Sequence, residues 1–83
     1  MRCYPNPAQY LLFVEYDLPE DGTFNLYVRN LQGQMIETLS SDERRAAGQY
    51  QHRLDASPYD AGVYVITLQT TKTALSERFI VAK

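Results

Sequence analysis

The stretch GVYVITLQT, residues 62–70, decides the fold class of this chain. Branched and aromatic side chains fill most of it, and such residues favour the pleated, half-buried surface of a sheet. Tyr64, Ile66 and Leu68 alternate with the residues between them, and a period of two is the signature of a strand. The pattern predicts a strand that packs against a core through one face.

The same alternation recurs along most of the chain. It predicts strands at residues 11–18, 23–30, 48–55 and 75–83, and a short strand at 34–39 with Ile36 as its anchor. Asn25, Tyr27 and Arg29 are expected to point outward. The side chains expected to point inward are Leu12, Val14, Tyr16 and Leu18; Phe24, Leu26 and Val28; and Tyr50, His52 and Leu54. In the last strand, Phe79 and Val81 share one face, and Ile80 and Ala82 share the other.

Residues 40–48, SSDERRAAG, break the alternation. Ser40 and Glu43 have the spacing of a capping box, and Gly48 is a residue that often ends a helix. The stretch is too short to form a stable helix unaided. We therefore expect a loop with one helical turn.

Turn signals at residues 19–22, 30–33 and 71–74, and a loop at 56–62, separate these strands. No strand–helix–strand pattern exists, so a parallel sheet is not expected. Six strands, or seven if the first run divides near residues 11–13, predict an all-β, antiparallel β-sandwich. A six-stranded barrel is the alternative.

Length, charge and hydropathy exclude several classes of function for this chain. The 83 residues imply one domain, and a net charge of −2 does not suggest a nucleic-acid surface. No apolar run is long enough to span a membrane, and no apolar segment of a signal peptide follows Met1. The chain is either cytosolic or a piece of a longer secreted protein.

Reactive groups are sparse. Cys3 is the single cysteine, so no internal disulfide can form. His52 is the single histidine, and it lacks the second ligand or the acid–base partner that metal or proton chemistry requires. We expect His52 to be a partly buried sheet residue, and we expect neither enzyme activity nor a metal or cofactor.

Two prolines mark the opening segment, CYPNPAQ, residues 3–9. Pro5 and Pro7 each lack a backbone donor and fix their own φ, and each pushes its predecessor toward an extended conformation. We expect residues 1–7 to be a stiff entry segment that stays off the first sheet, and residues 8–83 to form the sandwich.

The order of these features resembles a known family, the C-terminal sorting domains of type IX secretion system cargo (Por secretion system, type A) in Bacteroidetes. The resemblance runs from Tyr4 to Lys83. It rests on the following segments: YPNP at 4–7, YDLPEDG at 16–22, LYVRNLQGQMIETL at 26–39, AGQYQHRLDAS at 47–57, AGVYVITLQT at 61–70 and the final lysine.

The resemblance implies an immunoglobulin-like sandwich of about seven strands that follows a cargo domain in cis. It implies transit through the periplasm and through an outer-membrane translocon with its shuttle components, toward the cell surface or the extracellular space. A cell-surface sortase usually removes the domain, upstream of the first motif. The domain is then a sorting signal and not a catalyst, and its sequence does not identify the cargo.

The family's motifs fall on particular residues here. Its first motif falls on Pro5, Asn6 and Pro7, and its LDAS element falls on residues 54–57. Its glycine-rich motif falls on Gly62, Val63 and Tyr64, with Leu68 closing that strand. Its terminal motif falls on Lys83 and the strand that leads to it. Many members carry several basic residues in the last strand, whereas this one holds only Arg78 and Lys83. Packing alone also explains Gly62 and Tyr64.

The last strand, ERFIVAK, is the docking edge that the resemblance suggests, with Phe79, Ile80 and Val81 at its centre. An exposed sheet edge invites pairing by another chain, including dimerisation. Two other functions stay open. One is an accessory module that binds carbohydrate or a neighbouring domain, with Tyr27 as an outward aromatic, and the other is a structural spacer.

Overall fold

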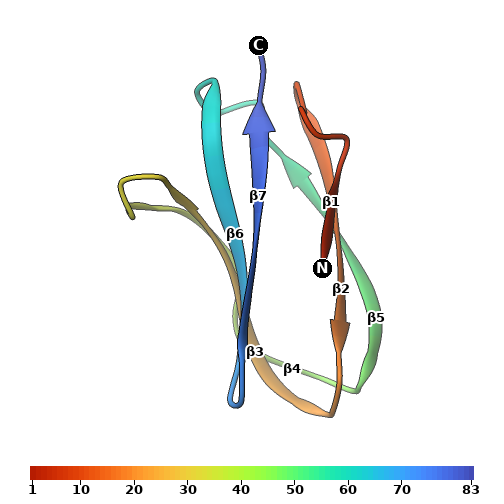
Figure 1. Ribbon diagram of the computed structural model, residues 1–83. Coiled ribbons are helices and arrows are strands. Elements are labelled where there is room, and N and C mark those ends of the chain that lie inside the picture. The colour runs from red at the N-terminus through yellow and green to blue at the C-terminus, as the bar shows by residue number, and fades with distance from the viewer.

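Two antiparallel sheets pack face to face in the computed structural model, which describes residues 1–83 (Figure 1). The strands are β1 (Arg2–Tyr4), β2 (Leu11–Leu18), β3 (Gly22–Asn30), β4 (Met35–Arg45), β5 (Gly48–Asp55), β6 (Gly62–Thr70) and β7 (Ala74–Val81). Sheet A has the order β1-β2-β5, and sheet B has the order β4-β3-β6-β7. The predicted all-β sandwich is confirmed, the strand order is immunoglobulin-like, and the barrel alternative is wrong. No helix is long and apolar enough to cross a membrane.

The core lies between the sheets and is built from the predicted alternation. On β2 and β6 the inward side chains Leu12, Val14 and Ile66 are fully buried. Asn25 and Tyr27 of β3 point outward, as predicted, while Phe24, Leu26 and Val28 are buried. Seventeen buried apolar residues from both sheets form a single cluster, so one core holds the two layers together.

The loop predicted at residues 40–48 is wrong, because β4 continues to Arg45 and β5 begins at Gly48. Pairing with β3 overrides the local helix signals: Glu43 lies opposite Phe24, and Arg45 lies opposite Gly22. Asp42 adopts a φ of 47°, and its N–H donates to the Asn25 side chain at 2.9 Å. These deviations belong to a bulged strand rather than to a helical turn.

Ile36 is not the anchor of its strand, because it is 39% exposed. A register shift between Val28 and Arg29 separates the pairs Val28–Glu37 and Arg29–Met35, which leaves Ile36 unpaired between them. The apolar residue of β4 that packs against the core is Leu39. The bulge breaks the alternation of this segment, so the period-two pattern predicted Ile36 as the anchor in place of Leu39.

The seventh strand lies at Arg2–Tyr4 and does not come from a division of the first run. It pairs with β2, with Cys3 opposite Val14, so the expectation that the opening segment stays off the first sheet is wrong. These three residues precede the first proline and keep their backbone donors. The peptide bonds before Pro5 and Pro7 are both cis. A domain boundary between residues 7 and 8 stays a prediction.

Candidate functional site: the motif end of the sandwich

Four segments that are distant in the sequence meet at one end of the sandwich. They are Pro5–Ala8, residues 56–61, the start of β6 and residues 80–83, and we call this group the motif end. Figure 1 shows the end of β7, the start of β6 and the turn between β1 and β2 together at the top of the view. Gly62 lies opposite Val81, and Ala8 forms a parallel bridge with Val81.

The Pro-Asn-Pro segment covers the outer edge of the last strand. The N–H of Ile80 donates to Asn6 Oδ1 at 2.9 Å, and the N–H of Ala8 donates to the Ile80 carbonyl at 2.8 Å. The N–H of Ala82 then donates to the Ala8 carbonyl at 2.8 Å. The chain therefore joins sheet A through β1 and sheet B through Asn6 and Ala8, and the backbone edge around Ile80 is already occupied.

Lys83 is held by the loop that follows β5. Its ammonium Nζ donates to the carbonyl oxygens of Ser57, at 2.6 Å, and Tyr59. The Ser57 hydrogen bonds lower the pKa of the nearby Asp55 carboxyl, and the charges of Arg53 and Lys83 add to this effect. Two carbonyl partners fix the ammonium in place, so this lysine is not merely solvated.

An aromatic cluster supports the loop that receives Lys83. The Tyr64 ring stacks on Phe79 at 5.6 Å between centroids, and its hydroxyl donates to the Asp60 carbonyl at 2.6 Å. Tyr59 lies 5.1 Å from Tyr64 and donates to Glu37 Oε1 at 2.7 Å. Burial, reinforced by the Glu37 carboxylate, raises the pKa of Tyr59 far above its usual range. The rings hold residues 56–61 against sheet B.

Comparison with known proteins identifies the family of this chain. A family model described as "Secretion system C-terminal sorting domain" matches residues 2–82. The chain belongs to this family. No curated protein and no solved structure matches it.

The sorting domain is accordingly a C-terminal signal for type IX secretion, which directs export toward the cell surface or the extracellular space. It works with a cargo in cis and with the type IX machinery. Domains of this family are not themselves catalytic. The alternative of an accessory binding or spacer module is not favoured. Tyr27, the outward aromatic residue of that alternative, lies under the Arg29 guanidinium, 5.2 Å from the ring centroid. Its neighbours on β6 and β7 are Thr67 and Ser76, so these strands add no aromatic ring beside it.

The predicted motif residues of the sorting domain do not all lie together. Pro5, Asn6 and Pro7, Gly62 to Tyr64 and Lys83 meet at the motif end. Leu68 lies toward the opposite end of β6, where it is 2% exposed and pairs with Leu26 and Leu75. Its place in the core gives it a packing role. Tyr59 was not predicted as a site residue. The one hint in the sequence was that it is the single aromatic residue of the predicted loop at 56–62.

The lone histidine and cysteine lie away from the motif end. His52 is half-buried on the inner face of β5, opposite Val14, as predicted. Cys3 is buried, and this burial, together with the Glu77 carboxylate, raises the pKa of its thiol to about 11. A thiol of this kind stays protonated and unreactive near neutral pH. No group of three or more histidine, cysteine or acidic side chains gathers where it could hold a metal.

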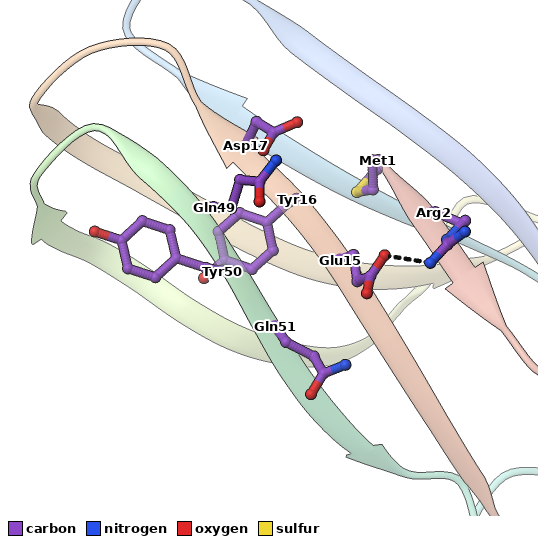
Figure 2. A pocket seen from close by; sticks show the side chains of 8 residues that line it. All are labelled: Met1, Arg2, Glu15, Tyr16, Asp17, Gln49, Tyr50 and Gln51. Carbon is purple, nitrogen blue, oxygen red and sulfur yellow. Dashed lines mark hydrogen bonds and ion pairs between the residues drawn. The ribbon is translucent and has the colours of Figure 1, made fainter.

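An open hollow of about 470 Å³ is lined by residues of the chain start, β2 and β5 (Figure 2). Glu15 is its central acid, and it accepts hydrogen bonds from Tyr4 Oη at 2.8 Å and from Arg2 at 2.7 Å. The Tyr4 hydrogen bond, aided by Arg2, lowers the pKa of Glu15. A carboxylate that is paired in this way stays ionised and is no general acid.

Proposed function

We propose that the motif end is the surface of the sorting domain that the type IX machinery reads. The supporting observation is the pair of carbonyl contacts from Lys83 to Ser57 and Tyr59, made beside the contact between Asn6 and Ile80. These bonds link the first motif, the loop after β5 and the terminal motif into one surface. Such a signal exists only in the folded domain, so the machinery reads a shape.

In this proposal the domain travels with its cargo through the periplasm, meets shuttle components and passes the outer-membrane translocon. A cell-surface sortase then cuts upstream. We place the cut before Arg2, because β1 is paired with β2 and Cys3 belongs to the core. A cut between β1 and Pro5 would remove a strand from sheet A.

Docking at the last strand is part of the same proposal, with one restriction. Phe79 and Val81 are 0% and 1% exposed, whereas Ile80 is 42% exposed. A partner of the folded domain therefore contacts the Ile80 side chain, which lies beside Val63 on the outer face of sheet B. Strand pairing at the Ile80 backbone requires the Pro5–Ala8 segment to leave first.

A reporter that carries a signal peptide, an upstream linker and the whole domain tests the proposal in a host with a type IX system. The informative variant is Lys83→Met, which keeps the length of the side chain and removes its donors. The matched control is Lys72→Met at the opposite end, where Lys72 pairs with Glu20 at 2.9 Å. The measured quantities are the surface and periplasmic fractions of the reporter, and the mass of the surface form reports the sortase cut.

We expect Lys83→Met to leave the reporter in the periplasm and Lys72→Met to export it normally. Equal surface fractions for the two variants contradict a signalling role for Lys83. A wild-type domain that fails to export the reporter at all contradicts the sorting role itself.

A further inference from the structure

Sheet A is one strand narrower than sheet B. On one side the layers are closed, because β1 lies near β7 and Ala8 bonds to β7. Counted from this side, β2 faces β6 and β5 faces β3, so β4 has no strand opposite it. The burial agrees, because the inward residues of β3 are buried whereas no residue of β4 is. We call the position beside β5 and over β4 the vacant strand position.

The edge of β5 beside this position is straight and unpaired. β5 pairs with β2 over eight consecutive residues without a register shift, and no strand lies on its other side. The N–H of Ala56 donates to the Tyr10 carbonyl, which extends the same register. Because hydrogen-bonded pairs alternate along an antiparallel ladder, the backbone groups of Gln49, Gln51 and Arg53 point away from β2. They offer a row of free donors and acceptors.

The other three edges are less suited to pairing. β1 has only three residues, β4 carries three register shifts, and β7 is covered at Ile80 by Asn6 and Ala8. Short, bulged and covered edges are the usual protections against strand addition. The edge of β5 has none of them.

The residues around the vacant strand position include partly buried apolar side chains, and they carry more acidic than basic groups. Leu39 of β4 and Tyr50 of β5 are partly buried against the core. Glu37 and Glu43 lie opposite the inward residues Val28 and Phe24 of β3, so they share the inner face of β4. Glu43 is paired with Arg45 at 3.2 Å, whereas Glu37 belongs to none of the three ion pairs and is bonded by the Tyr59 hydroxyl. Glu37 is exposed in the free domain. A strand laid over β4 would take this carboxylate out of water, so that strand must offer a cation there.

A second copy of this domain does not fit the position. Strands in a sheet lie about 4.8 Å apart, so a partner strand beside β5 lies directly over β4. If that strand were the β5 of another copy, the β3 beneath it would occupy the place of β4. The vacant strand position therefore admits only a partner strand that has no second sheet packed beneath it.

We propose that the β5 edge binds a single extended strand of a partner protein, which becomes the fourth strand of sheet A. Its inward positions carry aliphatic side chains that cover Leu39 and a lysine or arginine that pairs with Glu37. Main-chain hydrogen bonds to Gln49, Gln51 and Arg53 provide affinity, and the alternate side chains provide specificity. This surface touches the motif end only through Glu37, which accepts the Tyr59 hydroxyl. It includes neither the Lys83 nor the Asn6 contacts, so peptide binding at the β5 edge is tested independently of export.

The test uses two synthetic peptides and the whole domain. The probe is Thr-Val-Thr-Lys-Thr-Val-Thr-Val with blocked ends, and the matched control has glutamate in place of lysine. Amide hydrogen exchange and chemical shifts, followed by NMR at millimolar peptide, report binding at each backbone N–H. We expect the lysine peptide to slow exchange at Gln49, Gln51 and Arg53 and to bind about two- to fivefold more tightly than the glutamate peptide.

Proline variants test the edge itself. Gln51→Pro removes a donor that points away from β2, so the ladder of sheet A is retained and peptide binding is lost. Ser76→Pro makes the same change on the free part of the β7 edge and leaves binding intact. The amide spectrum of each variant shows that the fold is kept.

Four results overturn the proposal. The first is that neither peptide protects the β5 amides, and the second is that both peptides bind equally well. The third is that protection appears on β4 or β7 instead. The fourth is sedimentation of the free domain as a dimer whose protected amides are those of Gln49, Gln51 and Arg53.

Discussion

Removal of the Asn6 side-chain acceptor tests how the first motif is joined to the last strand. Asn6 Oδ1 accepts the Ile80 N–H at 2.9 Å, and two backbone bonds through Ala8 flank this contact. In Asn6→Ala the Ile80 N–H becomes hydrated at an exposed edge, so the loss is that of one net hydrogen bond, about 1 kcal/mol. For a domain of this size, a loss of about 1 kcal/mol lowers the thermal midpoint by roughly 4–8 °C.

Thermal unfolding followed by circular dichroism and amide exchange at Ile80 measure this effect. The exchange of the Ile80 amide is expected to quicken about fivefold, which corresponds to about 1 kcal/mol. Asn6→Asp is the matched control, because it retains an acceptor oxygen at the same position and is expected to stay close to wild type. An unchanged Ile80 exchange rate in Asn6→Ala, or an equal loss in Asn6→Asp, refutes the role given to this side chain.

Three further predictions concern the core. Phe79→Ala removes a fully buried ring that stacks on Tyr64 and should cost about 3–5 kcal/mol, which chemical denaturation will measure. Leu68→Met conserves volume and should cost less than about 1.5 kcal/mol with normal export; lost export at normal stability would assign Leu68 to the signal. Because the Cys3 pKa is raised to about 11, the folded state keeps its thiol proton. The unfolded chain loses this proton from about pH 9, so the contribution of Cys3 to the free energy of unfolding is full below pH 9 and falls as the pH rises. Cys3→Ala should therefore flatten the fall in the free energy of unfolding between about pH 9 and 10, as measured by denaturation curves.

The strands that alternation predicted are those whose inward face is covered by the other sheet. β2, β3 and β6 have their inner faces buried, so a period of two runs through each of them. β4 has no strand opposite it, and its inner face carries Glu37 and Glu43 beside a single apolar residue, Leu39. No local signal marked residues 40–45 as a strand, because the pairing with β3 is a long-range contact.

The motif end was predictable as a set of residues but not as a site. The order of Pro5–Pro7, residues 62–64 and Lys83 indicated the family. Nothing in that order indicated that Asn6 bonds to Ile80 or that Lys83 reaches the carbonyls of Ser57 and Tyr59. Both contacts depend on how the two sheets are stacked, which the local pattern of a strand does not encode.

The measurement that tests the central claim most directly compares export at equal stability. Asn6→Ala at the motif end and Ile66→Val in the core should both lower the free energy of unfolding by about 1 kcal/mol. Each is placed in the full-length cargo, and the surface fraction of the cargo is measured beside the thermal midpoint of the domain. We predict that Asn6→Ala loses export while Ile66→Val exports as wild type does. Equal export by the two variants would contradict the claim that the motif end is the surface that the machinery reads.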